Sequence, residues 1–433
     1  MNTRLKLLAL TLAVGVCLSW SAAWSPALAQ NSGLLLRDGD LTAICGDSIT
    51  EQKIYSMFIE EYLLACQPAA KLQTVQFGWG GETAPGFLRR MDRNVTDYHP
   101  TVATTFYGMN DGGYRAYDEN AQGKAYREGT LGIVKKFKEL GVRVIVVGSP
   151  GVVDSDAFNK RPNTPAAVYN ETLKVLGDIA REIADSEGVT FADVHTLMMD
   201  VMAKAKAKYG AEYHVGGPDG VHPAANGHLV IAYAFLKALG CDGNIGAITY
   251  DFGAGRATAD RAQNIIAATD GEIQVESTRY PFCFIGPDVH KPGHPFNVRS
   301  ILEFLPFNED LNRYTLTVKN ARGDLKVTWG KESKVFPADT LAKGINLAAE
   351  FPDNPFAEAF TKLDYIVRQQ QYFETPIMRL IAANATTISA LPDEAGPLGE
   401  VNKSLLDYNA RLRQLVAASV KPVTHTIKIE SAD

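Results

Sequence analysis

Short apolar runs alternate with longer amphipathic stretches over the first half of the chain. The apolar runs are rich in β-branched residues and are bounded by turn residues, which is typical of buried parallel strands. They predict five strands, at Leu41–Cys45, Leu72–Phe77, Val102–Tyr107, Val142–Val147 and Val189–Ala192. Apolar residues at helical spacing predict helices at Ile54–Cys66, Pro85–Tyr98, Gln122–Leu140, Pro165–Ser186, Leu197–Tyr209 and Asn226–Leu239. This alternation predicts an α/β domain with a parallel five-stranded sheet covered by helices on both faces.

The pattern changes after Gly240, which predicts a C-terminal α+β extension over residues 245–433. A small β-rich unit is expected at about 273–336, because alternating runs at Tyr314–Val318 and Leu325–Trp329 flank a turn signal and resemble a hairpin. Helical spacing then returns at about 337–420, and a closing strand is expected near the end. The predicted helices and strand are Asn354–Phe373, Val401–Val420 and Val423–Ile429. The extension is expected either to stand apart from the first domain or to pack onto it.

The N-terminus has the pattern of a secretory signal peptide at residues 1–29. Arg4 and Lys6 precede an apolar run, and Ala27-Leu28-Ala29 supplies a small-x-small cleavage site. Its removal leaves 41 basic against 49 acidic residues, a net charge of −8. An acidic chain without a basic stripe is a poor candidate for nucleic-acid binding. We therefore expect a secreted or periplasmic protein with no transmembrane span in its mature form.

Three predicted strands are each followed by a loop that contains a candidate catalytic residue. Ser48 follows the first strand in Gly-Asp-Ser, Gly81 lies in the Gly-rich loop after the second, and Asn110 follows the third. Asp219 and His222 share a loop just before the last predicted helix of the domain. Because parallel strands share one carboxyl edge, the first three loops are expected to converge on one crevice.

Together these residues fit what the hydrolysis of an ester by a serine requires. Ser48 would be the nucleophile, and His222 would accept its proton while Asp219 holds the other ring nitrogen. The backbone N–H groups of Ser48 and Gly81 and the side-chain amide of Asn110 would form the oxyanion hole.

This arrangement resembles the GDSL-type, or SGNH, serine hydrolases, which are named for a serine, glycine, asparagine and histidine in four sequence blocks. Ser48, Gly81, Asn110 and the Asp219-x-x-His222 pair match the four blocks in order, over about residues 40–240 of the 30–244 domain. Ile49 stands where the family has leucine. The resemblance implies a flavodoxin-like three-layer α/β/α fold, no metal or organic cofactor, and activity on esters such as acetylated carbohydrates, short acyl esters or lipids.

Other residues compete for roles in this site. His195, in Asp193-Val194-His195 after the fifth strand, is the rival candidate for the base. Trp79, Tyr107 and Tyr114 are candidate substrate-binding residues by position alone, with packing as the alternative. His290 and His294 lack the neighbouring ligands that a metal site needs.

The sequence thus predicts an exported serine esterase that acts on a small-molecule or polysaccharide ester through an acyl-serine intermediate, with carbohydrate O-acetyl groups as the leading substrates. A lipase, a thioesterase and a sugar O-acyltransferase remain open, since they would use the same residues. A non-catalytic carbohydrate-binding protein is the alternative of another class. Oligomeric state and cysteine pairing stay undetermined.

Overall fold

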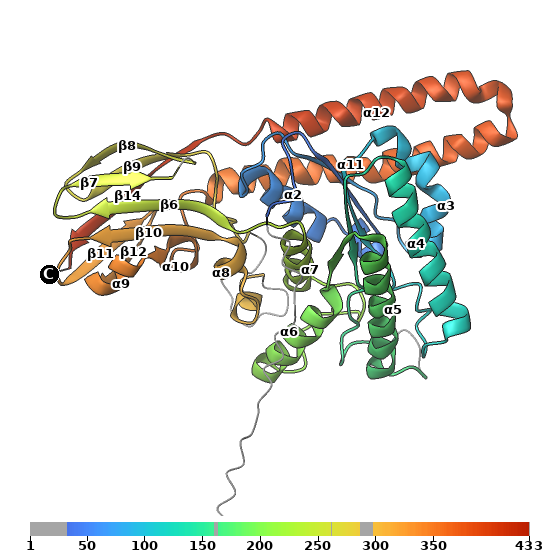
Figure 1. The fold of residues 1–433 in the computed structure, drawn as a ribbon, viewed down its shortest axis with the longest axis horizontal. Helices are drawn as coiled ribbons and strands as arrows, with labels where there is room; N and C mark the ends of the chain where they lie inside the picture. The colour runs from blue at the N-terminus through green and yellow to red at the C-terminus, as the bar shows by residue number, and fades with distance from the viewer. Residues whose placement is uncertain (1–32, 160–162, 261, 286–297, 433) are drawn as a thin grey trace, which may run out of the picture. The chain divides into compact units, whose positions relative to one another are not determined.

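One parallel five-stranded sheet organises the first half of the chain (Figure 1). The computed structural model describes residues 33–159, 163–260, 262–285 and 298–432. The strand order is β2-β1-β3-β4-β5, and every neighbouring pair is parallel. The strands are β1 Leu41–Gly46, β2 Gln73–Gln76, β3 Val102–Phe106, β4 Val144–Gly148 and β5 Thr190–Ala192. All five predicted strands are present, and the order is the flavodoxin-like one, with a topological switch point beside β1.

Helices cover both faces of this sheet, so the predicted three-layer fold is confirmed (Figure 1). In β1, Ile44 belongs to one buried cluster, whereas its neighbours Ala43 and Cys45 belong to the other. Successive side chains of a strand point to opposite faces, so the two clusters are the two sides of the sheet. One side packs against α2 Tyr55–Ala65, α6 Val194–Tyr209 and α7 Ala225–Ala238, and the other against α3 Ala84–Asn94, α4 Lys124–Glu139 and α5 Ala166–Glu187.

Two further sheets form the β-rich unit of the C-terminal region. One has the order β13-β10-β6-β7, and the other has the order β12-β11-β14-β9-β8. The strands are β6 Asn244–Asp251, β7 Arg256–Ala259, β8 Gln263–Thr269, β9 Glu272–Ser277, β10 Arg313–Lys319, β11 Asp324–Trp329, β12 Glu332–Pro337, β13 Ile345–Asn346 and β14 Val423–Ser431. Short helices lie among them at α8 Phe307–Leu311, α9 Ala338–Lys343 and α10 Leu347–Glu350. The expected closing strand is present as β14, between β11 and β9.

The predicted hairpin between residues 314 and 329 is wrong. The two runs are strands, but β10 pairs with β6 and β13, whereas β11 pairs with β12 and β14 in the other sheet. Their buried faces meet instead, since Tyr314 of β10 stacks on Trp329 of β11 with ring centroids 5.5 Å apart. The turn signal between them therefore carries the chain from one sheet to the other, a choice that local pattern does not determine.

A long helix from the C-terminal region covers the edge strand β2. Helix α11 spans Ala357–Ala390 and is followed by α12 Ala395–Ala417, so the first helix continues well beyond the predicted end at Phe373. Glu374 Oε2 accepts a hydrogen bond from the backbone N–H of Gln76 at 2.9 Å, and Gln370 Nε2 donates to the carbonyl of Thr74 at 3.2 Å. These contacts satisfy backbone groups at the unpaired edge of the sheet and hold the part of the helix that precedes its internal Pro376.

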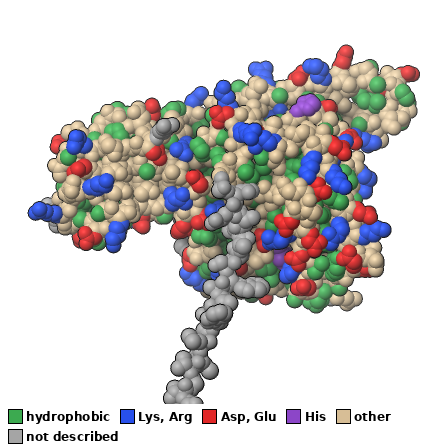
Figure 2. Space-filling view, viewed as in Figure 1, with side chains coloured by type: hydrophobic (Ala, Val, Ile, Leu, Met, Phe, Trp, Pro, Cys, Tyr) green, Lys and Arg blue, Asp and Glu red, His purple; other side chains and the backbone are tan. Residues whose placement is uncertain are grey.

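The remaining expectations concern the termini, the membrane and the cysteines. The predicted signal peptide lies outside the described residues. No helix in the described ranges is long and apolar enough to span a bilayer. On the face shown in Figure 2, acidic and basic side chains are interspersed. Cys45, Cys66, Cys241 and Cys283 are each buried with a free thiol.

Candidate active site

Ser48 lies where strand β1 passes into the short helix α1, Ser48–Glu51. Asp47 caps this helix, since its Oδ1 accepts a hydrogen bond from the N–H of Ile49 at 2.9 Å. Gly46 has no room for a side chain, because an added Cβ would lie 2.0 Å from Thr50 Oγ1. The tight turn leaves Ser48 partly exposed at the carboxyl edge of the sheet.

His222 and Asp219 reach Ser48 from the loop before α7. His222 Nε2 lies 2.8 Å from Ser48 Oγ, and His222 Nδ1 lies 2.7 Å from Asp219 Oδ2. An ionised Asp219 accepts the Nδ1 proton, which leaves Nε2 as the acceptor facing the serine hydroxyl. Burial raises the pKa of Asp219, but hydrogen bonds from the His222 ring and from the N–H groups of His222 and Val221 outweigh it, so the net pKa is lowered. The structure thus brings Ser48 together with a His222–Asp219 pair that lies more than 170 positions away in the sequence.

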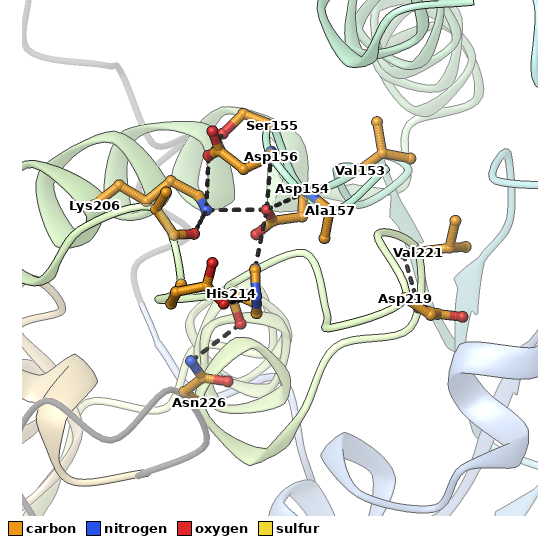
Figure 3. A network of polar contacts seen from close by, with 12 residues as sticks. Val153, Asp154, Ser155, Asp156, Ala157, Lys206, His214, Asp219, Val221 and Asn226 are labelled. Carbon is orange, nitrogen blue, oxygen red and sulfur yellow. Dashed lines mark hydrogen bonds and ion pairs between the residues drawn. The ribbon is translucent and has the colours of Figure 1, made fainter. Parts of the chain in front are cut away.

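A buried aspartate, Asp154, lies between Lys206 and His214 (Figure 3) and supports the segment that continues to His222. Its Oδ1 lies 2.9 Å from Lys206 Nζ and 3.2 Å from His214 Nδ1, and its backbone N–H donates to the carbonyl of Gly220 at 3.0 Å. His214 and Gly220 belong to the same segment as Asp219 and His222. The sequence analysis missed Asp154, because no motif marks a carboxylate whose partners lie 52 to 66 positions away in the chain.

The glycine loop after β2 lies beside Ser48. Glu82 N–H donates to the carbonyl of Trp79 at 3.2 Å, and Gly81, the third residue of this turn, has a φ of +74°. Glycine adopts such a backbone more readily than other residues, because it has no Cβ. A Cβ added to Gly80 would lie 4.0 Å from Ser48 Cβ, which places the turn next to the predicted nucleophile.

Asn110 is fixed by the same loop and by Tyr114. Its Nδ2 donates to the carbonyl of Glu82 at 3.0 Å, and its Oδ1 accepts from the Tyr114 hydroxyl at 3.1 Å. The neighbouring Asp111 accepts hydrogen bonds from the N–H groups of Ala84 and Gly108, at 2.9 and 3.0 Å. These bonds tie the loop after β3 to the loop after β2 at the switch point of the sheet.

The aromatic candidates differ in position. Tyr107 is 3% exposed, and its hydroxyl donates to Glu82 Oε2 at 3.1 Å, so it packs beneath the glycine loop. Tyr114 is partly buried and orients Asn110, while its ring stacks on Phe158. Trp79 is partly exposed, and Arg90 and Arg379 lie over its ring.

The other histidines occupy different surroundings. His195 is buried in the first turn of α6, where its Nδ1 is 3.0 Å from the Gly151 carbonyl, and desolvation lowers its pKa. His228 is fully buried on α7, where its ring contacts the Gln52 side chain and the N–H of Tyr55. His290 and His294 lie outside the described residues. Among the residues the structure describes, no group of three or more His, Cys, Asp or Glu is arranged to hold a metal ion.

The sequence of this region matches one known family. Residues 44–230 match the profile of the GDSL-like lipase/acylhydrolase family, and this range contains Ser48, Gly81, Asn110, Asp219 and His222. This segment is a GDSL-like lipase/acylhydrolase domain. The GDSL-like domain is an ester-bond hydrolase, as the sequence predicts.

Two similar proteins extend the comparison. An acetylxylan esterase of Geobacillus stearothermophilus is 23% identical over 192 residues, which cover 43% of this chain and 80% of that protein. A solved structure described as BT4096, a gut microbial diltiazem-metabolizing enzyme, is 23% identical with a TM-score of 0.69. The match covers 92% of this chain and 98% of that one, so the fold beyond the GDSL-like domain also recurs in another protein.

Proposed function

We propose that this chain is an exported serine esterase that removes short acyl groups, acetyl foremost, from carbohydrates. In this proposal Ser48 is the nucleophile, His222 is the general base and Asp219 fixes the imidazole. The observation that carries the assignment is the 2.8 Å contact between Ser48 Oγ and His222 Nε2, continued by the 2.7 Å contact between His222 Nδ1 and Asp219 Oδ2. These are the distances at which proton transfer through a histidine operates.

The proposed reaction has two halves. His222 Nε2 removes the hydroxyl proton as Ser48 Oγ attacks the ester carbonyl carbon, and the resulting imidazolium is stabilised by the ionised Asp219. The tetrahedral intermediate expels the alcohol, which takes its proton from His222, and an acyl-serine remains. Water then attacks the acyl-serine with His222 again as base, and the carboxylic acid and free Ser48 are released.

The oxyanion would be stabilised by donors from three loops. The backbone N–H groups of Ser48 and Gly81 and the side-chain amide of Asn110 are the proposed donors. One N–H of the Asn110 amide is used by the Glu82 carbonyl, which orients the group and leaves its second N–H for the substrate. Donors held in place before the reaction need no reorganisation when charge develops on the substrate oxygen.

The proposed substrate class rests on less direct support. One of the two similar proteins is an acetylxylan esterase. The partly exposed Trp79 beside Gly81 offers an aromatic wall of the kind that packs against a sugar ring or an acyl group. The signal-peptide pattern at residues 1–29 supports export from the cytoplasm. An exported enzyme can meet acetylated polysaccharides.

A fluorophosphonate probe tests the nucleophile directly. We expect the wild-type chain to be labelled and Ser48→Ala to remain unlabelled, because only an activated serine reacts with the phosphorus centre. His222→Ala is expected to lose most turnover, whereas His195→Ala serves as the matched histidine control and should retain it. An unlabelled wild type would favour a carbohydrate-binding protein without turnover, and the reverse result for the two histidines would reassign the base.

A panel of p-nitrophenyl esters tests the acyl preference. We expect a steep fall in kcat/KM from acetyl to octanoyl, together with acetate release from an acetylated glycan. Highest activity on octanoyl esters would instead support a lipase. Transfer of the acetyl group to an added acceptor sugar in preference to water would support an acyltransferase that shares the acyl-serine step.

A further inference from the structure

The C-terminal helix α11 contributes a cation to the edge of the active site. Arg379 forms an ion pair with Glu51, although the two residues are 328 positions apart in the sequence. The same guanidinium lies over the Trp79 ring, 5.3 Å from its centroid. Glu51 is the last residue of the short helix that begins with Ser48. Arg379 therefore contacts two residues that lie immediately beside the proposed nucleophile and the glycine loop.

Glu51 passes this contact on to the glycine loop. While its Oε1 faces Arg379, its Oε2 accepts the N–H of Gly80 at 2.7 Å. The Glu51 side chain is 22% exposed, whereas that of Arg379 is 50% exposed. A single carboxylate thus connects the guanidinium to the turn that carries Gly81.

The negative charge of the Glu51 carboxylate is unfavourable for catalysis at this place unless a cation offsets it. A Cβ added to Gly80 would lie 2.8 Å from Glu51 Oε2 and 4.0 Å from Ser48 Cβ, so the carboxylate is close to where an oxyanion would form. Two negative charges at such separations repel each other, and a cation on the carboxylate reduces that repulsion. Lys53 also belongs to the group, since its Nζ donates to the Glu51 carbonyl at 2.6 Å and lies over the Tyr372 ring of α11.

We propose that Arg379 is a positioning residue for the ester hydrolysis, acting through Glu51 and Trp79 on the loop Gly80–Gly81. It holds the Glu51 carboxylate in the orientation that binds Gly80 N–H, offsets the charge of that carboxylate, and fixes one face of the Trp79 wall. The C-terminal region is in this way a part of the active site. The inference rests on the proposed function, because it assigns Gly81 to the oxyanion hole.

Kinetics of four variants test this role: Arg379→Ala, Arg379→Lys, Glu51→Gln and the double variant Arg379→Ala/Glu51→Gln. With p-nitrophenyl acetate we expect Arg379→Ala to lower kcat about tenfold with KM within about twofold, as for loss of an interaction made in the transition state. Arg379→Lys should recover part of the loss, because it keeps the charge. The double variant should lose no more than the worse single variant, because both changes break one connected unit.

Lys362→Ala is the matched control, since it also removes one cation from α11 and Lys362 pairs only with Glu358 on the same exposed surface among the described contacts. It should retain kcat, and its Tm should match that of Arg379→Ala. Wild-type kcat in Arg379→Ala would overturn the inference and leave the proposed esterase intact. Losses that add in the double variant, or that follow Tm and are not recovered by lysine, would overturn it as well. A wild-type chain with neither turnover nor fluorophosphonate labelling would instead contradict the proposed function itself.

Discussion

Three aspartates near Ser48 differ in charge because their surroundings differ. Asp219 is partly exposed and hydrogen-bonded by His222, and its net pKa is lowered, so it stays ionised through the working range of an esterase. Asp47 is buried and Asp111 is half-buried, and desolvation raises the pKa of each to about 7. Only Asp219 is therefore placed to stabilise an imidazolium at mildly acidic pH, while the other two hold backbone N–H groups of the loops.

Asn110 provides a sharp test of the proposed oxyanion hole. Asn110→Ala removes a donor that Tyr114 and the Glu82 carbonyl hold in place, and we expect kcat on p-nitrophenyl acetate to fall roughly 10² to 10³-fold. Tyr114→Phe removes only the orienting hydroxyl and should cost about tenfold or less, because the contact to Glu82 remains. Fluorophosphonate labelling should persist in both variants, although more slowly. Full activity in Asn110→Ala would remove this amide from the mechanism.

The sequence alone predicts the candidate site residues that belong to motifs. Ser48, Gly81, Asn110, Asp219 and His222 each follow a strand or precede a helix with a recognisable spacing. The convergence of the three loops that carry Ser48, Gly81 and Asn110 follows from a rule of parallel sheets, whereas the approach of the His222 loop does not.

Asp154, Glu51 and Arg379 carry no such signal. Each contacts a partner that is distant in the sequence: Asp154 binds the loop of His222, and Arg379 binds Glu51 in the helix of Ser48. Glu51 in turn binds the N–H of Gly80. An isolated charged residue in an amphipathic pattern looks like a solvated surface residue until its neighbours in space are known.

At the scale of elements, the junction between β2, α2 and α11 buries two carboxylates. Gln370 and Gln371 of α11 donate to Glu60 of α2 at 3.0 and 2.7 Å, and Glu374 caps the N–H of Gln76. Desolvation raises the pKa of Glu60 to about 7 and that of Glu374 to about 8, although Arg413 of α12 lowers both. Both carboxyl groups hold a proton more tightly in the folded chain than in the unfolded chain.

This pair predicts a loss of stability as pH rises. A carboxyl group whose pKa is higher in the folded chain than in the unfolded chain adds stability that is fully present below the unfolded pKa, near 4.5. This stability is lost as pH rises through the folded pKa, which is about 7 for Glu60 and about 8 for Glu374. Buried His228 and His425, whose pKa values desolvation lowers to about 3 and 4, act at more acidic pH, so the range from pH 6.5 to 8.5 avoids the titration of these two histidines. Over that range we expect the free energy of unfolding to fall by on the order of 2 kcal/mol, or roughly 3 °C in Tm.

Amide substitutions provide the control for this prediction. Glu60→Gln and Glu374→Gln remove the titrating groups and should flatten the dependence of Tm on pH, whereas Glu358→Gln, on the exposed surface of the same helix, should leave it unchanged. Asp47 and Asp111 titrate in the same range and remain in all three variants, so a residual slope is expected. An unchanged slope in Glu374→Gln would show that its carboxyl does not titrate as described.

Element types were more predictable than element partners. Period and turn residues predict the five parallel strands to within two positions, because the strands β1 to β4 are largely buried on both faces. The same signals do not say which strands pair, so β10 and β11 were wrongly joined as a hairpin. Helix α11 was predicted too short, since it passes through Pro376 and is held by contacts to β2 that are about 300 positions away in the chain.

At the scale of the molecule, the described chain from Gly33 onward forms one compact unit. One buried cluster runs from the helices of the GDSL-like domain into the β-rich region. The Tyr62 hydroxyl donates to the Leu311 carbonyl at 2.8 Å, and the N–H of Tyr280 donates to the Ala65 carbonyl at the same distance. The C-terminal region therefore packs onto the first domain, which was one of the two arrangements that the sequence left open.

A shared core of this kind predicts a single cooperative unfolding transition. Phe282 lies at the junction, 2% exposed, with its ring 6.0 Å from Phe58 of α2 and 5.0 Å from Phe360 of α11. Phe282→Ala leaves a cavity there and should lower the stability of the whole chain by about 3 to 5 kcal/mol, with one calorimetric transition retained. Val335→Ala, on an exposed strand position of the same region, should leave Tm unchanged. In both variants esterase activity should disappear in the transition that removes the β-sheet signal. A separate, earlier transition of the β-rich region that left p-nitrophenyl acetate turnover intact would mean that the two regions fold independently, and it would also remove the physical basis for an active-site role of helix α11.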